Sequence, residues 1–189
     1  GARAIQYLRM RANEWNLDSA RFSAVGVSAG GCTVLWLAYH DDVADPRSPD
    51  PVARQSSRLQ AAVGMSPQTS LDPEEVVSWV GDQVLHHPMI ARAVGVSNRA
   101  ELIRRCAEFA PLLRECSPIT HVSADDPPVL IIHPTQAPLP AANASSAIHH
   151  AIFGVKLKQR ADQVGARCVH RIDDRETTGK PTAEEFLLE

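Results

Sequence analysis

The sequence predicts an α/β fold with a mainly parallel sheet and helices on both faces of that sheet. Four short apolar segments of strand length alternate with longer segments of helical character; the short segments are residues 21–27, 59–66, 127–134 and 166–172. Such alternation implies right-handed crossover connections and therefore parallel strands. A chain of 189 residues is also suited to a single domain with a core of its own.

Composition and charge exclude several classes of function. The net charge of −3 does not favour nucleic acid as a partner, and no apolar run approaches the roughly eighteen residues needed to cross a bilayer. The cysteines are widely spaced and form no CxxC pair, which predicts free thiols; they are Cys32, Cys106, Cys116 and Cys168. The histidine pairs of the chain lack metal-ligand spacing. We therefore expect no membrane span, no nucleic-acid partner, no metal and no cofactor.

The first third of the chain predicts two strands and two helices. Apolar residues recur at helical spacing over residues 2–15, and residues 21–27 have the character of a short buried strand. Residues 29–40 are small and then strongly apolar, which predicts a buried helix. Three prolines make residues 41–58 a surface loop, and a second buried strand follows at 59–66.

Residues 67–120 depart from the alternation because they contain helix signals but no strand signals. The stretch "DPEEVVSWVG" begins with proline and acidic residues, which is typical of a helix start. Ser97 or Asn98 is suited to cap a further helix that runs to about Phe109, with a short helical turn beyond it. We interpret residues 67–120 as a helical cap inserted into the α/β domain and bordering its functional site.

The last third of the chain predicts two more strands and two more helices. Proline-led, purely apolar residues 127–134 predict a strand. A helix headed by His149 and His150 ends at Gly165, and the fourth strand follows at once. Thr182, with Glu185 three residues later, predicts a capping box at the start of the final helix.

The stretch "AVGVSAGG" carries the strongest signal for chemistry. It places Ser28 between Gly26 and Gly30, at the end of a predicted strand and the start of a predicted helix. A nucleophilic serine on such a sharp turn is held in strained backbone geometry, and the two glycines together with Gly31 make room for it. The N-terminal end of the following helix would supply the backbone N–H of Ala29 as an oxyanion donor.

At these residues the sequence resembles the α/β-hydrolase fold, in particular esterases and lipases of the acetyl-esterase and hormone-sensitive-lipase kind. Residues 4–31 resemble their helix, strand and serine turn, and residues 116–134 resemble their approach to the strand that precedes the catalytic acid. The resemblance implies a partial α/β-hydrolase sheet whose N-terminal strands and second oxyanion loop precede Gly1. It also implies a carboxylic-ester hydrolase that uses Ser28 on a small ester substrate.

Two positions of the implied triad depart from the family pattern. Relatives carry His-Gly-x-x-Asp after the strand, whereas here His133 is followed by Pro134 and the acid position is occupied by Ala137. The family histidine belongs in the loop of residues 173–181, which contains none. That loop instead carries three carboxylates, Asp173, Asp174 and Glu176.

Several alternatives follow for the missing base and for the function. His149 and His150 lie on the side of the sheet where the site should form, and either could be the base, or the pair forms a polar helix end. His86 and His87 line a lid or belong to a solvated turn, and His170 packs within or against the sheet. The chain is accordingly an esterase that depends on Ser28 or an inactive hydrolase-fold module that binds a ligand or a protein partner. Without a base at Ser28, we expect weak hydrolysis that changes little when Ser28 is replaced.

Overall fold

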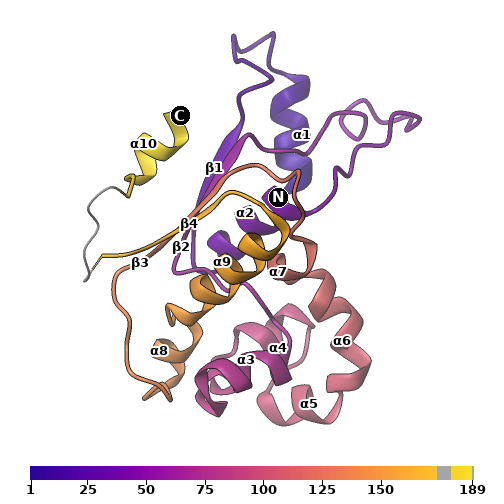
Figure 1. Cartoon of the computed structure of the whole chain (residues 1–189). Coiled ribbons are helices and arrows are strands. Elements are labelled where there is room, and N and C mark those ends of the chain that lie inside the picture. Colours follow the sequence, from indigo (N-terminus) through magenta and orange to yellow (C-terminus); the bar gives the residue numbers. More distant parts are fainter. Residues whose placement is uncertain (174–179, 189) are drawn as a thin grey trace.

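The computed structural model describes residues 1–173 and 180–188, which form a four-stranded parallel sheet with helices around it (Figure 1). The strands lie in the order β1-β2-β3-β4; they are β1 (Ser23–Val27), β2 (Ala61–Met65), β3 (Val129–His133) and β4 (Cys168–Ile172). All three pairings are parallel. The predicted fold class and all four predicted strands are confirmed.

The register of the strands brings their carboxyl ends to one edge of the sheet. Gly26 of β1 pairs with Gly64 of β2, which pairs in turn with Ile131 of β3. Ser28 therefore follows β1 at the same edge at which His133 ends β3. In parallel α/β sheets, ligand sites form at this edge.

Helices cover both faces of the sheet, as the sequence predicts. On one face, α1 (Ala2–Met10), α2 (Ala29–Tyr39) and α9 (Ile152–Val164) pack on the sheet through a core that includes Leu35, Val129 and Leu157. On the opposite face, α10 (Ala183–Leu188) buries Phe186 against β2 and β3. The predicted capping box is present in α10, because Thr182 Oγ1 accepts from Glu185 N–H at 3.2 Å and Thr182 N–H donates to Glu185 Oε2 at 2.7 Å.

Residues 67–120 contain helices and turns. The helices are α3 (Pro73–Val80), the 3-10 helix η1 (Asp82–His86), α4 (Met89–Ala93), α5 (Arg99–Arg104), α6 (Cys106–Glu115) and α7 (Pro118–His121). Figure 1 shows α3 and α4 between α8 (Ala144–Ile148) with the first turns of α9 on one side and α5 and α6 on the other. Ile148 and Phe153 join the apolar side chains of these helices in a second core.

The structure corrects four local expectations. α1 ends at Met10 instead of residue 15. The helix expected to run to Phe109 is two helices, because Arg105 leaves helical geometry (φ −107°, ψ 15°), and α6 then continues through Pro111. The strand at 21–27 is not buried: Val25 and Val27 are 51% and 62% exposed, because they lie on the face of the sheet that α10 covers over β2 and β3.

The fourth correction concerns the histidine pair. His149 and His150 do not head the long helix α9, which begins at Ile152. They lie after the short helix α8, whose C-cap is His149. A capping box at Asn143 starts α8, and neither α8 nor its cap was expected from the sequence.

One predicted property of the chain is confirmed. All four cysteines are free. Among the described residues, no helix has the length and apolar character needed to span a membrane.

Candidate active site

Ser28 occupies a sharp turn between β1 and α2. Its backbone has φ 53° and ψ −118°, a conformation rare for a residue other than glycine. The turn is held on both sides, since Ser28 N–H donates to the carbonyl of Met65 at 2.9 Å and the Ser28 carbonyl accepts from Cys32 N–H at 2.9 Å. The chain thus presents a serine in strained geometry at the carboxyl edge of the sheet.

The glycines around Ser28 contribute unequally to this turn. A Cβ atom on Gly26 would lie 2.2 Å from the carbonyl oxygen of Gly30, which excludes any side chain there. A Cβ on Gly31 would come within 3.0 Å of the Pro67 side chain. A Cβ on Gly30 would meet nothing within 4 Å, so the expectation that Gly30 also makes room for the turn is wrong.

The structure brings His149 to Ser28. Ser28 Oγ lies 2.8 Å from His149 Nε2, across 121 residues of sequence. The other ring nitrogen, Nδ1, lies 3.0 Å from the carbonyl oxygen of Ser145. A carbonyl only accepts, so Nδ1 carries the proton and the lone pair of Nε2 faces the serine hydroxyl. This is the tautomer that a general base requires.

His150 is engaged elsewhere with both ring nitrogens. It is 2% exposed; Nε2 lies 2.9 Å from the carbonyl oxygen of Ala137, and Nδ1 accepts from Ile152 N–H at 3.0 Å. These bonds define a neutral ring with a structural role. Ala137, at the acid position implied by the family resemblance, contacts His150 through its backbone and has no carboxylate to offer.

His133 and His170 form a second histidine pair beneath the edge of the sheet. Nδ1 of His133 lies 3.1 Å from Nε2 of His170, and a Cβ on Gly154 would meet the His170 ring at 2.5 Å, so His170 packs against the sheet, as expected, and also against α9. Burial, followed by the nearby His170, lowers the pKa of His133 to about 3. Burial lowers the pKa of His170 to about 4, with a further contribution from Lys180.

The remaining predicted site residues lie as follows. Ala29 is the first residue of α2, where backbone N–H groups have no acceptor within the helix. Asp173 pairs with Arg171 at 2.7 Å. Asp174 and Glu176 lie outside the described residues.

The helical segment 67–120 reaches the serine–histidine pair through His87. The rings of His87 and His149 are 6.1 Å apart and meet edge to face. Burial and the neighbouring His149 lower the pKa of His87, with a smaller contribution from Arg92. His86 is exposed at the end of η1.

Sequence reasoning did not identify Ser145, whose carbonyl orients His149. A local signal was present: Ser145 lies four residues before His149 and directly inside a helix capped by Asn143. Carbonyls at a helix C-terminus are free to accept side-chain donors.

The family model described as BD-FAE matches residues 2–152. No curated protein matches the chain.

Solved structures of esterases share the fold. An acetyl ester-xyloside bifunctional hydrolase from Caldicellulosiruptor lactoaceticus matches with a TM-score of 0.65 and 22% identity, over 90% of this chain and 53% of that one. A truncated carbohydrate esterase from gut microbiota matches with a TM-score of 0.56 and 20% identity, over 89% and 56%. Native esterase Est2 of Thermogutta terrifontis matches with a TM-score of 0.55 and 22% identity, over 99% and 59%. The chain thus spans little more than half the length of these structures.

Proposed function

This chain belongs to the BD-FAE family, a family of α/β-hydrolase-type esterases, and on that premise we propose that it hydrolyses small carboxylic esters with Ser28 as nucleophile and His149 as general base. The observation that carries the proposal is the 2.8 Å contact between Ser28 Oγ and His149 Nε2 at a strained strand-to-helix turn. A nucleophile and a base within this distance are the core of serine acyl transfer.

The proposed reaction has two halves. In the first, Ser28 Oγ attacks the ester carbonyl carbon while its proton passes to His149 Nε2, and the oxyanion that forms faces the N–H of Ala29. The tetrahedral intermediate then expels the alcohol, which takes the proton from His149, and the acyl group remains on Ser28. In the second half, water gives its proton to His149 and attacks the acyl carbon, and Ser28 Oγ leaves with that proton as the carboxylic acid is released.

The group that orients the base differs from that of a complete triad. The carbonyl of Ser145 fixes the tautomer of His149, as a carboxylate would, but it carries only a partial negative charge. It therefore stabilises the imidazolium formed during attack less than an aspartate does. We expect turnover below that of triad esterases and well above that of a serine without a base.

Short acyl groups are the first substrates to test. One matched structure is an acetyl ester-xyloside bifunctional hydrolase, and esterase Est2 of Thermogutta terrifontis is described with butyrate and with propionate bound. The acyl groups of these structures support a proposal that this chain accepts acetyl to butyryl esters.

The test compares Ser28→Ala and His149→Ala with the unchanged protein in hydrolysis of p-nitrophenyl acetate and p-nitrophenyl butyrate, and in labelling by a fluorophosphonate probe. We expect Ser28→Ala to abolish labelling and to lower kcat by about 10³-fold or more, because catalysis by a nucleophile and its base is lost as a unit. His149→Ala should lower kcat by a comparable factor. The exposed His86→Ala variant is the matched control and should keep full activity.

The second candidate is an inactive module that binds a ligand or a protein partner, and the absence of a carboxylate at Ala137 favours it. If the chain is such a module, the fluorophosphonate probe should label the unchanged protein no more strongly than Ser28→Ala. Ester hydrolysis should then be unaffected by Ser28→Ala and by His149→Ala. That result would overturn the esterase proposal.

A further inference from the structure

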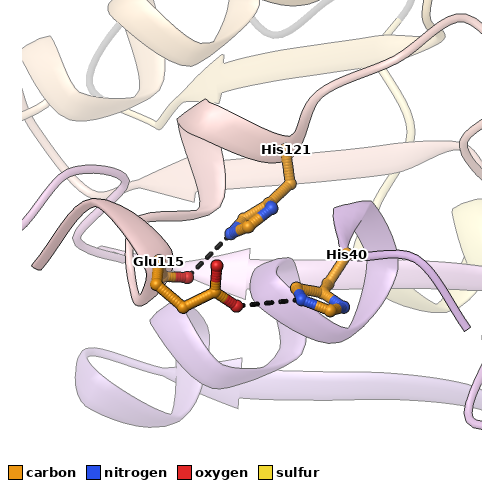
Figure 2. Close-up of side chains that lie close together, drawn as sticks. All are labelled: His40, Glu115 and His121. Atoms are coloured by element: carbon orange, nitrogen blue, oxygen red, sulfur yellow. Dashed lines mark hydrogen bonds and ion pairs between the residues drawn. The ribbon is translucent and has the colours of Figure 1, made fainter. Parts of the chain in front are cut away.

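A group of metal-ligating side chains lies far from Ser28, where three helix ends meet. His40 is the C-cap of α2, Glu115 is the last residue of α6 and His121 is the last residue of α7. One ligand atom from each side chain lies within 4.8 Å of the other two. Figure 2 shows both imidazole rings turned toward Glu115.

The surroundings hold the rings in place. His40 stacks on Trp36, one helical turn earlier, with ring centroids 4.1 Å apart, and the ring of His121 meets that of Trp36 edge to face. Trp36 Nε1–H donates to the carbonyl of Glu115 at 2.8 Å, which anchors the end of α6 to α2. The two imidazole rings are thus held in place by packing at the helix ends.

The two ring nitrogens of His40 both face oxygen acceptors, which favours a cation at Nε2. Nδ1 lies 2.8 Å from the carbonyl oxygen of Asp41, and Nε2 lies 2.9 Å from Glu115 Oε1. A neutral imidazole has one N–H for these two acceptors. With Nδ1–H held by the carbonyl, the lone pair of Nε2 faces a carboxylate, which is favourable only when a second proton or a metal ion lies between them. A backbone carbonyl on the far nitrogen is the outer contact that metal-binding histidines commonly make.

The electrostatic field at the C-terminal ends of α2 and α6 also favours a cation between His40, Glu115 and His121. Helix C-termini carry partial negative charge from unpaired carbonyls. α2 and α6, of 11 and 10 residues, both end here, and the Glu115 side chain adds a full negative charge.

We propose that His40, Glu115 and His121 bind a divalent transition-metal ion, Zn²⁺ in the first instance, which ties the helical segment 67–120 to the end of α2. Two imidazoles and one carboxylate suit Zn²⁺, whereas Mg²⁺ and Ca²⁺ prefer oxygen ligands only. Metal–ligand bonds of about 2.0–2.2 Å need ligand atoms roughly 3.3 Å apart, so the three atoms have to close by about 1.5 Å at most. The 54% exposed Glu115 side chain has the freedom to do so.

The hydrogen bond that His121 Nε2 makes with the Glu115 carbonyl can be given up to a metal ion. Nε2 of His121 lies 2.7 Å from the carbonyl oxygen of Glu115. When this nitrogen turns to a metal, the carbonyl keeps its bond from Trp36 Nε1–H. His40 follows Ser28 by twelve residues, about 18 Å along the helix axis, so the ion acts on packing and not on the ester.

The experiment measures zinc binding to the tag-free protein by calorimetry, with the thermal midpoint and the visible absorption of the Co²⁺-substituted form as second readouts. We expect one strong site per chain, a Tm raised by about 5–10 °C at zinc concentrations near one hundred times Kd, and visible bands of low-symmetry Co²⁺. Mg²⁺ should do none of this. His121→Ala and Glu115→Gln should each weaken zinc binding at least tenfold and remove the Tm shift.

Two controls separate this site from the serine–histidine pair. His86→Ala and His149→Ala should both retain the zinc affinity and the Tm shift, whatever the esterase activity of each variant. Circular dichroism of His121→Ala and Glu115→Gln establishes that the loss is one of binding and not of folding. Zinc binding that survives in both cluster variants, or that disappears in His149→Ala, would overturn the proposal, as would a chain that takes up no zinc.

Discussion

Gly26 and Gly30 flank Ser28 symmetrically in the sequence, but they differ in the space that the fold leaves for a side chain. Gly26 lies where β1 passes the first turn of α2, and a Cβ there would overlap the Gly30 carbonyl at 2.2 Å. Gly30 lies within α2 and borders open space. Of the two flanking glycines, only Gly26 is therefore required to lack a side chain.

This difference predicts opposite effects of the same substitution. Gly26→Ala forces β1 and α2 apart, so we expect a loss of several kcal/mol in the free energy of unfolding and weak labelling of Ser28. Gly30→Ala should leave stability unchanged or raise it by about 0.5–1 kcal/mol, because alanine is the better helix residue. Urea unfolding of both variants is the measurement, and equal losses would show that the elbow has no special need of Gly26.

Among the secondary-structure elements, the short helix α8 positions His149 beside Ser28. Its five residues carry Ser145, whose carbonyl orients His149, and His149 is its C-cap. Asn143 caps the start of α8, and its Oδ1 accepts from Ser146 N–H at 2.9 Å. The position of His149, the proposed base, thus depends on the Asn143 cap.

Asn143→Ala should reduce both stability and catalysis. Loss of a helix cap costs about 1 kcal/mol, and a frayed α8 moves His149 away from Ser28. Asn98→Ala is the matched control, because Asn98 caps α5 with the same 2.9 Å bond but has no contact with His149 in the described structure. We expect similar shifts in urea midpoint for the two variants and a fall in kcat for Asn143→Ala alone. A fall of equal size in both would mean that kcat follows general stability.

The elements that sequence predicts well are those with local signals. Apolar runs predicted the four strands, and Thr182 with Glu185 predicted the cap of α10. The sequence does not predict α8, because five residues give no periodicity, and it leaves the choice between His149 and His150 open, because Ser28 lies 121 residues away from His149. The cluster of His40, Glu115 and His121 leaves no motif in the sequence either. Its residues come from the ends of three helices, and only the tertiary fold brings them together.

At the scale of the whole molecule, burial of histidine links folding to pH. His133 is fully buried at the end of β3, and its Nε2 has no hydrogen-bond partner among the described residues. His170, on the neighbouring strand β4, is half-buried beside it. Burial lowers the pKa of His133 from 6.5 to about 3 and that of His170 to about 4.

The folded protein should therefore lose stability as the pH falls. Below pH 6.5 the unfolded chain takes up protons on both histidines, and the folded chain does so only near pH 4 and pH 3. Stability is then highest above the unfolded pKa and falls by up to about 1.4 kcal/mol per pH unit for each histidine on the way down. His133→Leu removes one of these groups, so it should flatten the loss of stability between pH 6.5 and pH 4, although it also breaks the 3.1 Å bond to His170 and so lowers stability at pH 7. Urea unfolding across this range, with the exposed His86→Ala as control, is the measurement; a His133→Leu variant that loses stability as steeply as the control would assign the acid sensitivity to other groups.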